Sequence, residues 1–529
     1  MKFSPSNFNP FRHTQRFDRP FSFKELYRHP GSLSVRDRSG SRKQIGIIGG
    51  GIAGLTSAYE LSQLGHAVTL LESSTRLGGR IRTHYFSDGN YGELGAMRIP
   101  TNHRCTLYYV DKFNLPTRPF VSYNPAGFYH LRGRKARLDA FSELFPAFNL
   151  TPQERQDPSL LYENPLQELI ATLSCTEKWE MFSPTFESAK LKQYDGITFA
   201  QYFRDRLSRD AFELVGHATG MIHYERVSLL EGLIDFFSWY RVDQYQLIGG
   251  METLVDAFVQ QLQGQIKCNA KVTAIQITDS GAIVHWNSLG RREAKEFDYI
   301  ICTVPATALA RIDFHPDLPA KKKQAIGNLT YGSAVKTLFH CTARPWELHD
   351  NIYGGGSFTD LPIEKCWYPS DNAQPANTPL SATLTKDDQV DYSEASQCWS
   401  ARDPELSHHP AVFTAAYRWE NNARQFLTLD ESEQTDSTLH QVKQLHPQID
   451  QYVDAIVHCS WDEQSNPGSG AYAYFTPGDH ERYQEVLSLP FPLDNPRVFF
   501  AGEHLAINHA SIQGAIQTAL SATIDVLES

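Results

Sequence analysis

The sequence has no long hydrophobic run and no excess of positive charge. No stretch of about 18 apolar residues occurs, so we expect no membrane-spanning helix. The formal net charge of −11 at pH 7 argues against a nucleic-acid partner, because phosphate binding requires a basic surface. The first 30 residues mix aromatics with Arg, His and Pro and contain no apolar segment of the signal-peptide kind, so we expect a cytoplasmic protein.

Cysteine is sparse and scattered. The eight cysteines form no CxxC pair and have no spacing typical of metal ligands, so we expect neither a disulfide framework nor a metal site. The composition, with 41% hydrophobic and 12% aromatic residues, is that of a globular protein. At 529 residues the chain is long enough for two or three domains.

The stretch Gln44–Glu72 carries the strongest pattern in the chain. A short apolar run, Ile45–Ile48, predicts a buried parallel strand. A Gly-x-Gly-x-x-Gly pattern, an amphipathic helix and a second strand, Val68–Leu71, follow it, and an acidic residue ends that strand. This order is typical of a dinucleotide-binding βαβ unit.

Each glycine of the pattern has a physical role. Gly49 allows the tight turn from strand to helix, Gly51 lets the backbone approach a pyrophosphate, and Gly54 lets the helix pack closely on the strand. The N-terminus of the helix, at Ile52 and Ala53, offers free N–H groups and a partial positive charge to that pyrophosphate.

A second glycine loop follows the acidic residue. Glu72 can accept hydrogen bonds from a ribose diol, and Ser73 is its neighbour. The segment Arg76–Thr83 then places Gly79 beside alternating arginines, including Arg80, which predicts a loop next to the dinucleotide with arginines for its phosphates.

The segment Gly92–Pro100 places Arg98 between apolar neighbours, among them Ala96 and Met97. A half-buried arginine needs an anionic partner. The segment alone leaves two interpretations open, which are an internal salt bridge and an anionic ligand.

The middle of the chain changes character over residues 119–240. Segments such as Pro165–Leu173 and Phe199–His217 have helical periodicity, which predicts a helical insertion. We interpret His217 and His223 as structural residues, because a lone histidine usually is one.

The region 330–490 alternates strand-like and helical runs and predicts a β-rich second domain. Lys336 lies in an otherwise apolar strand, Tyr331–Phe339, and would be a buried amine if it points inward. A later strand carries Tyr417 and Trp419 on one face.

Three other segments complete the organisation. Residues 1–43 predict either a solvated arm or a strap held to the body by its aromatics, and residues 370–410 predict a long surface loop. Residues 247–304 predict a helix and strands that return to the first domain, and the last unit is a buried strand ending at Gly502 and a helix that runs to Ser529.

These blocks resemble the flavin amine oxidase superfamily and, within it, the L-amino acid oxidases. The resemblance covers nearly the whole chain from Ile45 to Leu527 and is strongest in IGIIGGGIAGL…VTLLE, LGGRIRT, GELGAMRIP, YGSAVK and FFAGEH…GAIQTAL. It implies an α/β fold, α+β overall, with a Rossmann-like FAD-binding domain, a mixed-sheet substrate domain and a helical insertion. The expected boundaries are an N-terminal arm at 1–42, the FAD-binding domain at 43–80, 247–328 and 491–529, the substrate domain at 81–137 and 329–490, and the helical domain at 138–246.

The resemblance also implies residue roles around the cofactor. Glu72 matches the ribose carboxylate, Val272 matches the residue whose backbone meets the adenine, and Glu503 and Ile512 match positions that hold the ribityl chain and flavin ring. Motif and resemblance together predict cofactor contacts at Gly49, Gly51, Ile52, Ala53, Gly54, Glu72, Ser73, Gly79, Arg80, Ala96, Met97, Arg98, Val272, Gly502, Glu503 and Ile512.

For the substrate, the resemblance assigns Arg98 to the α-carboxylate and Tyr417 as its phenol partner. Lys336 matches the catalytic lysine that holds a water at the flavin, and the Ala510 carbonyl matches the acceptor of the substrate amine. Ser511 stands where the family often has an aromatic residue, which implies a roomier pocket. Trp419 and Ser511 complete the predicted substrate-binding residues.

The expected activity is that of an FAD-dependent L-amino acid oxidase, which uses oxygen and yields a 2-oxo acid, ammonia and hydrogen peroxide. No Ser-Gly-Gly-Cys-Tyr-type attachment block occurs, so FAD should be bound non-covalently. An L-amino acid 2-monooxygenase stays open as the alternative, because the arm at Phe21–Tyr27 is similar to what such enzymes carry. A polyamine or monoamine oxidase is disfavoured, because Arg98 would then lack a carboxylate.

Oligomeric state, substrate charge and one alternative function complete the expectations. We expect a homo-oligomer, a dimer, although no segment encodes one. Asp235 and Asp243 would favour a basic substrate if the fold brought them to the pocket. A non-catalytic flavin-bound interaction protein is the alternative from another class, and it would show no flavin response to any amino acid.

Overall fold

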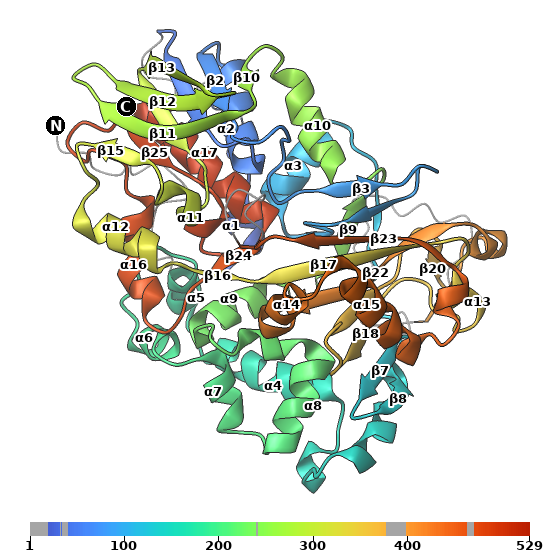
Figure 1. Cartoon of the computed structure of the whole chain (residues 1–529). Coiled ribbons are helices and arrows are strands. Elements are labelled where there is room, and N and C mark those ends of the chain that lie inside the picture. Colours follow the sequence, from blue (N-terminus) through green and yellow to red (C-terminus); the bar gives the residue numbers. More distant parts are fainter. Residues whose placement is uncertain (1–19, 32, 34–40, 240–241, 377–397, 463–469) are drawn as a thin grey trace.

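The computed structural model describes residues 20–31, 33, 41–239, 242–376, 398–462 and 470–529 (Figure 1). Its architecture is mixed α/β, as the sequence predicts. No helix in these residues is long and apolar enough to cross a bilayer. All eight cysteines lie in the described ranges, and none of them forms a disulfide there.

A five-stranded parallel sheet contains the Gln44–Glu72 unit, with the strand order β10-β2-β1-β14-β25. Strand β1 pairs with β2 on one side and β14 on the other, so that Ile45 lies beside Val68 and Tyr299. The strands are β1 (Gln44–Ile48), β2 (Ala67–Leu71), β10 (Ile266–Lys267), β14 (Tyr299–Cys302) and β25 (Val498–Phe500). Early, middle and late parts of the chain thus share one sheet, while the domain boundaries themselves stay a prediction.

Both faces of this sheet are covered, which explains why its central strands are mostly apolar. One face packs on helices α2 (Ile52–Gln63), α3 (Arg104–Lys112), α10 (Glu252–Gln261) and α17 (Ile512–Glu528). The other face packs on a four-stranded sheet of order β13-β12-β11-β15, in which Trp286 and Val284 join a core with Ile48. The strands of that sheet are β11 (Ala270–Ile277), β12 (Ala282–Ser288), β13 (Arg291–Phe297) and β15 (Asp313–His315).

The second large sheet has seven strands in the order β23-β17-β22-β19-β18-β7-β8. Every residue of β17 is buried, and its antiparallel partner β22 places Tyr417 directly opposite Lys336. The strands are β7 (Phe128–Leu131), β8 (Arg134–Arg137), β17 (Ala334–Cys341), β18 (Gly356–Thr359), β19 (Lys365–Trp367), β22 (Ala411–Trp419) and β23 (Val453–Ser460). The outer face is covered by α13 (Pro345–Leu348), α14 (Glu420–Phe426) and α15 (Glu431–Leu445).

The strand predicted over Tyr331–Phe339 is two strands. Strand β16 (Thr330–Gly332) pairs with β24 (Tyr472–Tyr474), whereas β17 belongs to the seven-stranded sheet. The chain changes sheets at Gly332, which packs so closely on Tyr472 that a Cβ would lie 2.3 Å from its ring. Only glycine leaves room for this crossing.

The remaining short strands pair outside these sheets. The expected surface loop contains a two-stranded ribbon, β20 (Ala373–Pro375) with β21 (Trp399–Ala401), and residues 377–397 lie outside the described part. The other short elements are β3 (Thr83–Tyr85), β4 (Tyr91–Glu93), β5 (Ile99–Pro100), β6 (Thr117–Pro119), β9 (Gln244–Leu247), α11 (Ala306–Leu309), α12 (Ala320–Asn328) and α16 (Asp479–Ser488).

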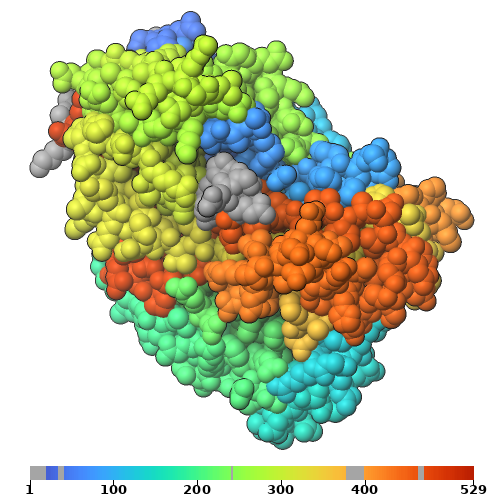
Figure 2. Space-filling view, viewed as in Figure 1, coloured from blue at the N-terminus to red at the C-terminus, as the bar shows by residue number. Residues whose placement is uncertain are grey.

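The helical insertion is present and has its own apolar core. The predicted run Phe199–His217 is divided into α7 and α8, because the Ser208 side chain accepts a hydrogen bond from the Ala211 N–H and so caps α8. In the space-filling view the insertion is green and occupies much of the lower part of the molecule, below the orange surface that includes helices α14 and α15 (Figure 2). Its helices are α4 (Pro158–Ala171), α5 (Cys175–Met181), α6 (Ala189–Asp195), α7 (Phe199–Arg204), α8 (Arg209–Thr219) and α9 (Leu229–Trp239).

Residues 20–31 form a strap over this insertion, the second of the two arrangements expected for the arm. Helix α1 (Phe23–Leu26) follows Phe21, whose ring stacks on Phe182 with the centroids 5.2 Å apart. The Tyr27 hydroxyl lies 3.2 Å from Ser238 Oγ at the end of α9. Residues 1–19 lie outside the described part.

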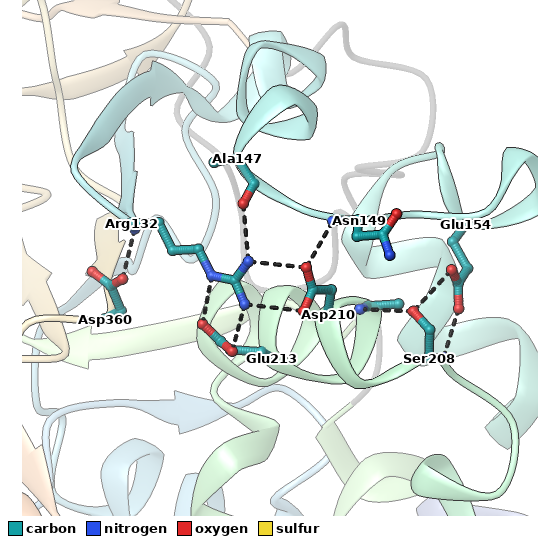
Figure 3. Close-up of polar contacts among 9 residues, drawn as sticks. Arg132, Ala147, Asn149, Glu154, Ser208, Asp210, Glu213 and Asp360 are labelled. Carbon is teal, nitrogen blue, oxygen red and sulfur yellow. Dashed lines mark hydrogen bonds and ion pairs between the residues drawn. The ribbon is translucent and has the colours of Figure 1, made fainter.

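The turn between β7 and β8 is fastened to helix α8 by one arginine (Figure 3). The Arg132 guanidinium donates to both oxygens of Glu213 at 2.7–2.8 Å, to Asp210 at 3.0 and 3.2 Å, and to the Ala147 carbonyl at 2.9 Å. The Arg132 N–H donates to Asp360 at 2.6 Å. This cluster joins the seven-stranded sheet to the helical insertion at the surface.

Candidate active site

A cavity of about 690 Å³ reaches from the glycine loops of the parallel sheet to the inner face of the seven-stranded sheet. Most of the predicted site residues line it. They are Gly49, Gly51, Ile52, Ala53, Glu72, Ser73, Gly79, Arg80, Ala96, Val272, Lys336, Tyr417, Trp419, Gly502, Glu503, Ala510, Ser511 and Ile512. Three predicted residues, Gly54, Met97 and Arg98, are not part of this lining.

The glycine loop after β1 has the backbone geometry that its pattern predicts. Gly49 has a φ of +106°, and a Cβ there would lie 2.6 Å from Thr303 Oγ1. A Cβ on Gly54 would lie 1.9 Å from the Gly49 carbonyl oxygen, so Gly54 serves helix packing behind the loop. Gly51 faces Gly79 across the gap between the two glycine loops, which leaves exposed backbone on the cavity wall.

Glu72 ends β2 at the cavity. One carboxylate oxygen accepts the Gly50 N–H at 2.7 Å, and the other accepts the Ser74 N–H at 2.8 Å and the Ser73 hydroxyl at 3.2 Å. These donors fix the carboxylate where it lines the cavity. The acidic end of the predicted βαβ unit is therefore in place.

Arg76 and Arg80, two of the three arginines of the second glycine loop, have protein partners. Arg76 donates to the carbonyls of Leu77 at 2.8 Å and Ile81 at 2.9 Å. Arg80 forms an ion pair with Glu503. This use of the guanidinium groups was not foreseen, and contact of either arginine with a phosphate stays a prediction.

Glu503 connects three segments of the wall. Besides the Arg80 pair, it accepts the Ala473 N–H at 3.0 Å and the Ala510 N–H at 3.1 Å. Ala510 has a φ of +57°. Ser511 caps α17 by accepting the Gly514 N–H at 2.9 Å, so the helix begins at Ile512 on the cavity wall. The N-terminus of a second helix therefore reaches the cavity, as the sequence predicts.

Lys336 is a buried amine, as predicted, with 3% of its surface exposed. Its Nζ donates to the Gly95 carbonyl at 2.6 Å, lies 3.4 Å from Met97 Sδ, and sits 4.6 Å from the centre of the Tyr417 ring. Burial lowers the pKa of Lys336, while the buried Glu93 carboxyl nearby opposes that change. The amine ends at the wall of the cavity between the two sheets.

The Arg98 guanidinium lies in an aromatic compartment. Its guanidinium carbon is 5.0 Å from the centre of the Trp367 ring and 5.5 Å from the centres of Phe120 and Trp239. Among the described residues it has no hydrogen-bond or ion-pair partner, so the internal salt bridge considered above is not formed there. Burial lowers the pKa of Arg98, and Tyr417 and Asp235 oppose that change.

Comparison with known proteins identifies the family. The model of the flavin-containing amine oxidoreductases matches residues 52–527. The chain belongs to this family. It is 30% identical to an L-amino-acid oxidase of Vipera ammodytes ammodytes, over 92% of this chain and 93% of the relative, and 30% identical to the putative L-amino-acid oxidase YobN of Bacillus subtilis (strain 168), over 92% and 94%.

Solved structures show the same fold at low identity. Wild-type putrescine oxidase bound to putrescine superposes with a TM-score of 0.71 at 18% identity, covering 92% of this chain and all of that one. Cyclohexylamine oxidase from Brevibacterium oxydans IH-35A superposes with a TM-score of 0.67 at 17% identity, covering 92% and 98%. As a flavin-containing amine oxidoreductase, the protein uses a flavin cofactor.

Several residues near Arg98 were not predicted as members of the site. Trp367 of β19 and Trp239 of α9 form its compartment, and Tyr224 donates to the Asp235 carboxylate nearby. His223, interpreted as structural, lies 3.2 Å from Glu364 and 5.1 Å, between ring centres, from Trp419. Helical periodicity marked α9 as a helix, but no pattern in the sequence shows that its last turn faces Arg98.

Proposed function

We propose that this protein is an FAD-dependent L-amino acid oxidase that converts an L-amino acid, oxygen and water to a 2-oxo acid, ammonia and hydrogen peroxide. The observation that carries the proposal is Arg98, a half-buried cation in aromatic surroundings that forms no hydrogen bond or ion pair with an anion among the described residues. An amino acid carboxylate is a suitable anion, because a guanidinium binds it with two parallel hydrogen bonds.

The cavity fits FAD as the flavin. Exposed backbone at Gly51, the first turns of α2 and α17, and the fixed Glu72 carboxylate suit a pyrophosphate and a ribose. Val272 lines the same end and would contact the adenine. No described residue of the lining is a cysteine, which supports non-covalent binding. Bound FAD would supply the two-electron acceptor that oxygen then regenerates.

The remaining residues would orient the substrate. Arg98 and the Tyr417 hydroxyl would hold the carboxylate, and the Ala510 carbonyl would accept from the amine. Trp419 and Ser511 would border the side chain. Lys336, held by the Gly95 carbonyl, would place an amine at the reacting end of the cavity and carry a proton there.

Anaerobic reduction of the purified protein by the common L-amino acids tests this proposal. We expect the yellow flavin to bleach with at least one L-amino acid, and acid precipitation to release intact FAD. Product analysis under air should then find 2-oxo acid and peroxide. An amide with carbon dioxide would instead identify the 2-monooxygenase, and bleaching by simple amines alone would contradict an amino acid substrate.

A further inference from the structure

Asp235 stands on the same face of helix α9 as Trp239. The two residues are four positions apart, so their side chains lie one above the other. The Trp239 ring centre is 5.5 Å from the Arg98 guanidinium, which shows that this face of α9 borders the Arg98 compartment. The fold thus brings Asp235, one of two acidic residues considered from the sequence, to the side of α9 that faces the Arg98 compartment.

The Asp235 carboxylate has few partners of its own. Among the described residues its one hydrogen-bond donor is the Tyr224 hydroxyl. Arg98 is the cation that stabilises its charge, while Glu231 on the same helix adds a second negative charge. Arg98 and Asp235 are therefore opposite charges that favour each other's ionised form, and no ion pair joins them among the described residues.

Substrate binding would change this balance. A carboxylate that binds Arg98 pairs with the cation that stabilises the Asp235 charge, and it adds a negative charge nearby. A neutral side chain would leave Asp235 buried without a cation, which is costly. A side chain with a positive charge would restore the balance.

We propose that Asp235 binds a positively charged side-chain end, so that the substrates are basic L-amino acids of the lysine, ornithine and arginine type. The proposal rests on the function proposed above and specifies its substrate class. In the complex, Arg98 binds the carboxylate at one end of the substrate, and Asp235 binds the ammonium or guanidinium at the other.

The walls of the pocket suit such a side chain. The rings of Tyr417 and Trp419 lie 4.5 Å apart between centres, and Tyr472 follows at 5.3 Å from Trp419. All three rings line the cavity. Aromatic faces pack well on methylene stems and attract cations.

Lys365 is the feature that would favour the opposite class, an acidic side chain. It lies on the site face of β19, two residues before Trp367, and its Nζ has no hydrogen bond or ion pair among the described residues. The amine is nevertheless compensated. It lies against Gly220, where a Cβ would be 2.2 Å from Nζ, at the C-terminal end of α8 and beside Glu364. Asp235 has no such second partner.

The test compares substrates of matched length on the intact holoenzyme. Rates of anaerobic flavin reduction are measured with L-lysine, L-norleucine and L-glutamate, for the natural protein and for Asp235→Asn. We expect the second-order rate constant of flavin reduction by L-lysine to exceed that by L-norleucine by about 30-fold or more, and Asp235→Asn to remove most of this preference by slowing the reaction with L-lysine alone. Asp243→Asn, a change at the other acidic position near α9, should leave the preference intact.

Asp235→Glu keeps the charge and moves it by one methylene, so it should retain the preference for a basic side chain and shift it toward the shorter L-ornithine. If Asp235→Asn does not fold, the substrate ranking of the natural protein and the Asp235→Glu shift decide the question.

A preference for L-norleucine, or an equal loss on both substrates in Asp235→Asn, would overturn the role of Asp235 while leaving an L-amino acid oxidase. A preference for L-glutamate would also overturn it and identify Lys365 as the selecting residue. If no L-amino acid reduced the flavin, the proposed function itself would fail, and this result is distinct from the others.

Discussion

Replacement of Arg98 by alanine should separate amino acids from amines. In the proposed complex, the guanidinium forms two hydrogen bonds with the substrate carboxylate in a compartment of three aromatic rings. The arginine has no competing carboxylate contact among the described residues, so its removal takes away the main attraction for that group. The variant also leaves Asp235 without its cation, which adds to the loss for any substrate that carries an anion.

The magnitude follows from the burial of the pair. Loss of one partner of a buried, hydrogen-bonded charge pair costs about 2–5 kcal/mol. This corresponds to a decrease of roughly 30- to 5000-fold in kcat/KM. The effect should fall mainly on KM if the carboxylate is held equally before and during the reaction.

The assay is steady-state oxygen consumption with an L-amino acid and its decarboxylated amine, which differ only in the carboxylate. Arg98→Ala should weaken turnover of the amino acid and change that of the amine little. Arg104→Ala, an exposed arginine at the start of α3, is the matched control and should behave like the natural protein. Equal loss on both substrates, or no loss, would refute the carboxylate-binding role.

Four further outcomes can be checked. Glu72→Gln should raise the dissociation constant for FAD about tenfold or more, because it removes a charged acceptor for the ribose, and fluorescence titration of the apoprotein would show this. Lys336→Met should slow flavin reduction or reoxidation with FAD still bound; wild-type rates in both half-reactions, followed by stopped flow, would exclude a catalytic amine. Burial raises the pKa of Asp235 to about 6, so kcat/KM for L-lysine should fall as pH decreases through that value while kcat/KM for L-norleucine does not, because only the ionised carboxylate attracts the cation. Arg132→Ala should lower the free energy of unfolding by about 1 kcal/mol or less, since its ion pairs are partly exposed, and should leave FAD content unchanged; a larger loss in a thermal denaturation assay would show that the hairpin contact is more important than surface pairs usually are.

Local patterns in the sequence predicted the parts of the site that neighbouring residues determine. The βαβ unit from Gln44 to Glu72 has the expected strands, helix and acidic end. Its hydrophobic periodicity, the spacing of its glycines and the acidic residue that ends the second strand all lie within one short stretch of sequence. The burial of Lys336 followed from its apolar flanks. The βαβ unit and the buried strand around Lys336 both depend on residues that are close to one another in the chain.

The surroundings of Arg98 depend on tertiary contacts, which local sequence patterns do not predict. Trp239 and Trp367 reach the guanidinium from a helix and a strand more than 100 residues apart in sequence, and neither has a signature that indicates the other. The sequence likewise could not show that Arg76 donates to the carbonyls of Leu77 and Ile81 in its own loop.

The distribution of charges around the cavity indicates how the two ends of a substrate are told apart. The Arg80 guanidinium is neutralised by Glu503, and the Lys336 amine is held by a backbone carbonyl with Glu93 close by. The contacts of Arg80 and Lys336 therefore stabilise the cavity wall. Arg98 alone of the three faces no fixed anion at hydrogen-bonding distance among the described residues. A ligand carboxylate consequently gains most at Arg98, which fixes the orientation of the substrate before any side-chain contact with Asp235 contributes to selectivity.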